Sequence, residues 1–255
     1  MFTTPIAFAS MVFICTTVGA GAGMVLSRFL PEQQLSPETK DIVRLAMGLV
    51  LTMTALVLGL VTASAKSTFD AQNMAVRQGS ANVLTLDRML AQCGPDANDI
   101  RKRIKQVVAY RLAVTWPQAS WQAVRVATTE DLPVVEDIQR RIVALVPKTE
   151  EEKWYKGRAL EISNEIFHAR WLTFGSTGAS VSWAFLAVLT FWLTAIFLSF
   201  GLFAPRNVVV GGVILISALS VAGAVFLIME MDDPFTGLLK VSGEPLAYSL
   251  SMLGR

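Results

Sequence analysis

Four long stretches of the chain contain no charged residue and consist mainly of apolar side chains. They extend over Pro5–Leu26, Leu45–Ala65, Val181–Phe203 and Val208–Met229. Each holds about 20 residues, which at about 1.5 Å per residue form a helix of roughly 30 Å, the thickness of the hydrocarbon core of a bilayer. The pattern therefore predicts four transmembrane helices. The first stretch lacks the basic start and the cleavage site of a signal peptide, so we expect it to be a span as well.

The polar segment 66–178, between the second and third spans, is predicted to be a helical domain. Its apolar residues recur at helical spacing, for example from Ile100 to Leu112. The tetrapeptide Cys93–Asp96 contains Gly and Pro and predicts a turn between two helices, and Thr149–Glu152 fits a capping box at the start of another. The fold class is therefore an all-α integral membrane protein, with four transmembrane helices and a helical domain between the second and third.

The second span is expected to continue as one long helix into the polar segment. Between Ala65 and Cys93 the sequence holds no strong helix breaker apart from Gly79. The polar residues 230–255 after the fourth span form a C-terminal segment, and Trp116-Pro117 predicts the end of a helix because proline disfavours the α conformation in the residue before it.

Composition and charge support a membrane protein and suggest its orientation. Hydrophobic residues make up 53% of the 255 residues and charged residues 16%, which is typical of membrane proteins. The net charge of +2 offers no argument for a nucleic-acid partner. One side carries more basic residues near the span ends than the other: Lys66, Arg77, Lys156, Arg158, Arg170, Lys240 and Arg255 against Arg28, Lys40, Arg44 and Arg206. The positive-inside rule thus predicts a multi-pass protein of the inner (plasma) membrane with both termini and segment 66–178 in the cytoplasm.

Small and hydroxyl residues form a stripe along one face of the second span, with a basic residue at each end. The stripe recurs at steps of three and four and consists of Arg44, Gly48, Thr52, Ala55, Gly59, Thr62 and Lys66. One interpretation is a water-filled pore whose end cations favour anions. The other is close packing of helices in lipid, which small residues allow, with the end cations reaching the headgroups. The sequence leaves both interpretations open.

Three carboxylates lie directly after the fourth span, at Glu230, Asp232 and Asp233, and Pro234 follows them. An aspartate before proline is a good helix N-cap, so we expect Asp233 to begin a short new helix. Because acidic oxygens also bind hard cations, a Ca²⁺ site at these residues is the alternative.

No catalytic site can be assembled from the residues present, so no enzyme activity is expected. His168 is the only histidine, and the chain has no G-x-S-x-G motif. The two cysteines, Cys15 and Cys93, suggest neither a disulfide framework nor a metal cluster. The motif Gly19-x-Gly-x-Gly23 lies inside an apolar span, where it favours helix contact rather than nucleotide binding.

Two motifs resemble those of a family of bacterial membrane proteins of unknown function that is described as bestrophin-like. They are AYRLAVTWPQAS, at Ala109–Ser120, and MEMDDPFTGLLKVSGEPL, at Met229–Leu246. The acidic-x-Asp-x-Pro-Phe-x-Gly pattern of that family is matched by Glu230, Asp232, Pro234, Phe235 and Gly237. The order of two spans, helical domain and two spans also agrees over nearly the whole chain.

The resemblance extends more distantly to bestrophins, which are pentameric anion channels. It implies a homo-oligomer in the lipid bilayer that passes small anions such as chloride, with Gly48, Thr52, Ala55, Gly59 and Thr62 lining the pore and Arg44 and Lys66 at its mouths. It also implies a Ca²⁺ site at Glu230, Asp232 and Asp233, as in animal members. The sequence departs from bestrophins in lacking an Ile-Pro-Phe neck and in its shorter acidic run. The rival hypothesis is a nonconducting membrane scaffold or sensor with a cytoplasmic partner.

Overall fold

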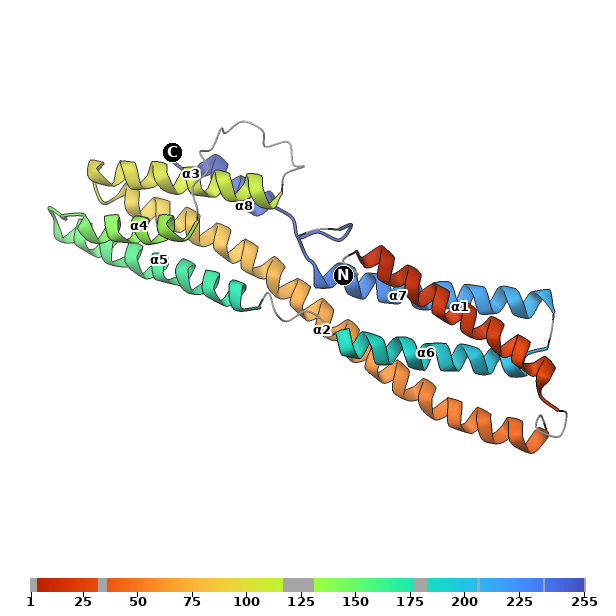
Figure 1. Cartoon of the computed structure of the whole chain (residues 1–255). Helices are drawn as coiled ribbons and strands as arrows, with labels where there is room; N and C mark the ends of the chain where they lie inside the picture. Colours follow the sequence, from red (N-terminus) through yellow and green to blue (C-terminus); the bar gives the residue numbers. More distant parts are fainter. Residues whose placement is uncertain are drawn as a thin grey trace. The chain divides into compact units, whose positions relative to one another are not determined.

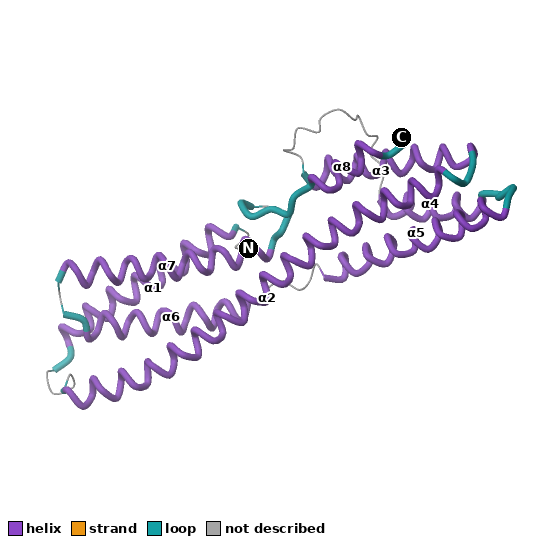
Figure 2. The backbone as a smooth tube through the Cα atoms, turned by 180° about the vertical axis from the view of Figure 1, so that it is seen from behind, coloured by secondary structure: helices purple, strands orange, loops and turns teal. Residues whose placement is uncertain are grey.

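The computed structural model describes residues 4–31, 36–116, 131–176, 183–205, 207–235 and 237–254, and these residues form α-helices joined by short connections, with no strand among them. Figures 1 and 2 show the arrangement of the elements within each part of the chain. The helices are α1 (Pro5–Phe29), α2 (Pro37–Ala91), the 3₁₀ turn η2 (Pro95–Ala97), α3 (Asn98–Thr115), α4 (Asp131–Ala144), α5 (Glu150–Ser176), α6 (Trp183–Phe203), α7 (Val208–Asp232) and α8 (Glu244–Met252).

The four predicted spans are confirmed as helices. By length and composition, α1, α2, α6 and α7 are able to cross a membrane. The second of them is a single helix of 55 residues, which confirms that it continues far beyond its apolar part. The all-α class is therefore confirmed.

The chain divides into two compact units, and each unit is built from two separate stretches of the sequence. The membrane unit comprises Met1–Phe69 and Ala179–Leu239, and the helical unit comprises Asp70–Gly178 and Lys240–Arg255. The last residues of the chain thus fold together with the middle segment, an association that the sequence alone did not predict.

In the membrane unit, α1 packs along both α6 and α7. The closest approach is between α1 and α6, at two glycines. A methyl group on Gly23 would overlap the Leu198 carbonyl oxygen, and one on Gly201 would overlap the Ala20 carbonyl oxygen. The interpretation of Gly19 and Gly23 as helix-contact residues is confirmed, since hydrogen-sized side chains let the two backbones meet.

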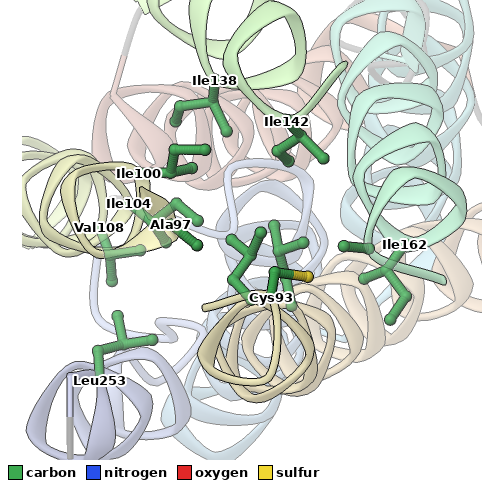
Figure 3. Packing of buried hydrophobic residues seen from close by; sticks show 12 residues of the cluster. Cys93, Ala97, Ile100, Ile104, Val108, Ile138, Ile142, Ile162 and Leu253 are labelled. Carbon is green, nitrogen blue, oxygen red and sulfur yellow. The ribbon is translucent and has the colours of Figure 1, made fainter. Parts of the chain in front are cut away.

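In the helical unit, a core of aliphatic side chains joins α2, α3, α4 and α5. Figure 3 shows Ile100 beside Ile138, and Val108 directed toward Leu253, all of which belong to one buried cluster. Leu253 has no exposed surface. Burial of a side chain of this size is worth about 1.5–3 kcal/mol, so the C-terminal residues contribute directly to the stability of this core.

The predicted boundaries at Cys93–Asp96, Thr149 and Trp116 agree with the structure. Helix α2 ends at Ala91, and Gly94, the N-cap of η2 with φ of 85°, adopts a conformation in the turn that glycine tolerates without strain. The Thr149 hydroxyl accepts a hydrogen bond from the Glu152 amide at 3.1 Å, which confirms the cap that begins α5. Helix α3 ends at Thr115, with Trp116 as its C-cap, and Pro117 lies outside the described residues.

Candidate functional site

Helix α2 is the membrane-spanning helix that the rest of its own chain covers least. Only 6% of its most apolar window is buried, compared with 28% for α1, 33% for α6 and 28% for α7. A single copy of the chain therefore leaves most of the surface of α2 to lipid, to water or to another protein chain.

In the apolar part of α2, the covered residues form one narrow face. It includes Thr54 and Ala65, which are buried. It also includes Val57 and Leu58, which pack against a cluster of buried side chains in the membrane unit that contains Val12. The spacing of these residues is that of one side of an α-helix. This face attaches α2 to its own chain.

The predicted stripe lies on a different face and is exposed along its whole length. At about 100° per residue, its centre is roughly 120° around the helix axis from Thr54. Its members are all exposed in the single chain: Arg44, Gly48, Thr52, Ala55, Gly59, Thr62 and Lys66. A methyl group on Gly48 or Gly59 would meet no other atom within 4 Å. Among the described residues none packs against the stripe, so its environment is lipid, water or another protein chain.

The hydroxyl groups of the stripe are engaged by the helix itself. The Thr52 hydroxyl donates to the Leu49 carbonyl oxygen at 2.8 Å, and the Thr62 hydroxyl donates to the Leu58 carbonyl oxygen at 2.7 Å. In this arrangement the hydroxyl hydrogens do not point outward. Attraction of an anion to the stripe would therefore come from the basic residues at its ends rather than from the threonines.

The basic residues at the two ends differ in their surroundings. Arg44 forms an exposed ion pair with Asp41 at 3.5 Å, which offsets part of its charge. The Lys66 ammonium lies 5.9 Å from the centre of the Phe69 ring, a cation–π contact.

Glu230, in the last turn of α7, has a role that the sequence did not predict. Glu230 is only 3% exposed, and its carboxylate accepts hydrogen bonds from the Leu238 amide at 2.5 Å and the Leu239 amide at 3.1 Å. Gly237, with φ of 78°, lies directly against this carboxylate and leaves no room for a Cβ atom. The buried carboxylate thereby organises the turn that follows the span.

The prediction that Asp233 begins a new helix is wrong. Asp233 is instead the C-cap of α7, which extends to Asp232, and Pro234 and Phe235 lie in a turn. The physical reason is that the Glu230 carboxylate binds the amides of Leu238 and Leu239, which draws the chain back toward the end of α7.

The predicted cation site at Glu230, Asp232 and Asp233 stays a prediction. Glu230 is turned inward to the backbone amides, whereas Asp233 is exposed. In the part of the chain that the structure describes, no group of three or more acidic, histidine or cysteine side chains is placed to hold a metal ion.

Sequence reasoning missed a contact that joins the two family-like motifs. The indole nitrogen of Trp116 donates a hydrogen bond to the Val241 carbonyl oxygen at 2.8 Å, and a methyl group on Gly243 would lie 2.9 Å from the Trp116 ring. The only signal in the sequence was that each motif contains one partner, with Trp116 near the end of the first and Val241 in the second.

Sequence reasoning also missed a buried ion pair in the helical unit. The Arg101 guanidinium donates two hydrogen bonds to the Asp87 carboxylate, at 2.8 and 2.9 Å. These bonds raise the pKa of Arg101 above its usual value. Arg101 therefore helps to hold α3 against α2 through Asp87. In the sequence it is only one of three consecutive basic residues, Arg101–Arg103.

Comparison with known proteins agrees with the membrane architecture. The sequence pattern of the bestrophin-like domain matches residues 14–246. A crystal structure of a bacterial bestrophin homolog from Klebsiella pneumoniae has a TM-score of 0.65 at 15% sequence identity, and covers 97% of this chain and 99% of its own. A different point variant of that homolog has a TM-score of 0.58 at 13% identity, with 96% and 98% covered. The comparison with curated proteins found no match.

Sequence identities this low establish a shared fold and leave function to be argued from the site. The family pattern covers nearly the whole chain, and the four membrane-spanning helices with their helical unit agree with the fold of the solved homolog. This chain therefore belongs to the bestrophin-like family.

Proposed function

We propose that the chain forms a homo-oligomeric channel in the plasma membrane that passes small anions such as chloride, with the α2 stripe facing the pathway. The observation that carries this proposal is the exposed stripe on the least covered span. Small and hydroxyl residues suit the wall of a water-filled pathway, and the basic residues at both ends favour anions. Both termini and the helical unit are assigned to the cytoplasm on the basis of the lysine and arginine distribution. The family resemblance suggests five subunits.

The first test of this proposal is the reversal potential of purified protein in a planar bilayer under a chloride gradient. Reversal near the chloride equilibrium potential is expected. Reversal near the cation potential would contradict anion selectivity, and the absence of current above mock-purified membranes, from protein shown to be folded, would contradict a channel.

The second test asks whether the stripe lines the pathway. Helix α2 offers two threonines for this comparison, one on the stripe and one on the buried face. Thr52 is exposed on the stripe, whereas Thr54, two positions later, is buried against the bundle. In a background with Cys15→Ser and Cys93→Ser, a negatively charged thiol reagent should reduce the current of Thr52→Cys by about tenfold or more and leave Thr54→Cys unchanged, because only Thr52 would face water. Equal effects at both positions would contradict the assignment. Thr52→Glu should likewise lower anion flux or reverse selectivity.

A nonconducting scaffold or sensor remains the second candidate, and one observation favours it. Val146, in the turn between α4 and α5, is 78% exposed, and Trp154, near the start of α5, is 63% exposed. Exposed tryptophan is typical of partner-binding surfaces. A stable cytoplasmic partner that is lost with Trp154→Ala, together with an absence of current, would support this candidate over the channel.

A further inference from the structure

A short segment of the chain, residues 237–243, connects the last membrane span to the helical unit, and we call it the strap. Its first three residues belong to the membrane unit and its last four to the helical unit. Each part is held within its own unit by one side chain, the first by the buried Glu230 and the second by the aromatic Trp116.

The first anchor is the Glu230 carboxylate. Two consecutive strap amides, those of Leu238 and Leu239, donate to the same oxygen of this side chain. A buried carboxylate that accepts charge-assisted hydrogen bonds is costly to detach, because detachment leaves it without partners in a poorly solvated place. The start of the strap is therefore fixed to the last turn of α7.

The second anchor is Trp116, at the end of α3. Its indole N–H binds the Val241 carbonyl oxygen, and its ring covers Gly243, where a larger residue would collide. Val241 is buried as well. The end of the strap is therefore fixed to the helical unit by both a hydrogen bond and ring packing.

Helix α8 extends this second attachment. It begins directly after the strap, with the Ala247 amide bonded to the Gly243 carbonyl oxygen at 3.0 Å. The Ser249 hydroxyl donates to the Ser80 carbonyl oxygen of α2 at 2.9 Å, and the Gly254 amide donates to Asp87 at 3.2 Å. The strap is thus continuous with an element that is bound to the helical unit along its length.

We propose that the strap is a coupling element that transmits conformational change between the end of α7 and the helical unit. Only Lys240 lies between Leu239, held by the first anchor, and Val241, held by the second. One residue spans too short a length to absorb a displacement, since consecutive Cα atoms are about 3.8 Å apart. Release of either anchor therefore loosens the other. This inference holds for a channel and for a scaffold alike.

Hydrogen–deuterium exchange of the full-length protein in lipid nanodiscs tests the coupling without any measurement of current. Trp116→Phe keeps the ring over Gly243 but removes the donor to Val241. It is expected to speed exchange of the Leu238 and Leu239 amides, at the opposite anchor, by about fivefold, the effect of one ordinary hydrogen bond. Trp154→Phe, the same substitution at an exposed site of the helical unit, should leave these two amides unchanged.

The reciprocal variant is Glu230→Gln, which keeps the shape of the side chain and removes its charge. It should speed exchange of the Ala247 amide at the start of α8 by a similar factor. Effects of both variants that stop at Lys240 would show that residues 237–243 are a passive linker and overturn the proposal. Trp116→Phe alone decides the question if Glu230→Gln does not assemble.

Discussion

Asp87 carries a formal charge and yet has no exposed surface. Arg101 binds both of its carboxylate oxygens, and the Gly254 amide supplies a further hydrogen bond. A buried charge is tolerated only where it is paired and hydrogen-bonded in this way. The ion pair therefore connects α2, α3 and the C-terminal residues at a single point.

Asp87→Asn is expected to destabilise the helical unit by about 3 kcal/mol, because the substitution leaves the mostly buried Arg101 without its counter-charge. Chemical denaturation followed by circular dichroism measures the loss. Asp99→Asn is the control, since Asp99 forms an exposed pair with Lys102 at 3.3 Å and should change stability by less than about 1 kcal/mol. Equal losses for the two variants would contradict the buried role of Asp87.

Cys93 is expected to make the folding stability depend on pH. Burial, reinforced by the nearby Glu152 carboxylate, raises the pKa of the Cys93 thiol above its usual value, while Lys156 acts in the opposite direction. The folded state thus disfavours the thiolate, so the unfolded state releases its proton first as the pH rises. Stability from this group is present below the pKa of the unfolded thiol and declines above it.

We therefore expect the melting temperature to fall more steeply between pH 7.5 and pH 10 in Cys15→Ser, which retains Cys93, than in Cys15→Ser with Cys93→Ala. The measurement is thermal unfolding of both proteins in the same detergent across this pH range. Parallel curves would show that ionisation of Cys93 is not linked to folding.

At the scale of elements, α1 and α6 come close together because Gly23 and Gly201, which have no Cβ atom, lie at their contact. Gly23→Ala is expected to cost about 1–3 kcal/mol or more, because its methyl group would enter the backbone of α6 and force the helices apart. Gly21→Ala is the matched control on the same helix, where a methyl group meets nothing within 4 Å. That substitution should be neutral or slightly stabilising, since alanine favours a helix over glycine.

Thermal unfolding of the two glycine variants in one detergent compares them directly. A larger loss for Gly21→Ala than for Gly23→Ala would be inconsistent with the close approach of α1 to α6.

Helix α2 illustrates how far local sequence determines an element. The absence of breakers between Ala65 and Cys93 correctly predicted one long helix, because helix propagation depends on neighbouring residues. The end of α7 illustrates the opposite. Asp233-Pro234 has the local features of a helix start, but Glu230 binds amides eight and nine residues ahead and forms a turn instead.

At the scale of the whole molecule, the uncovered surface of α2 predicts self-association. The stripe consists of small and hydroxyl residues, which allow neighbouring helices to approach closely in a membrane. Native mass spectrometry from a mild detergent should therefore detect a multiple of the 27.7 kDa chain, and the family resemblance suggests five copies. Denaturation in dodecyl sulfate should return the single-chain mass. A single-chain mass in nanodiscs as well as in detergent would contradict this prediction.

The sequence by itself determined the four spans, the helical class and the position of the stripe, because hydrophobic period, helix breakers and caps act between residues within a few turns of one another. It did not determine what the acidic residues or Trp116 contact. The Trp116–Val241 bond joins residues 125 positions apart, and the bond from Gly254 to Asp87 joins residues 167 apart. Such contacts form only when distant helices pack, so only the tertiary structure showed Glu230 as an anchor, the C-terminal residues as part of the helical core, and the α2 stripe as the surface that one chain leaves open.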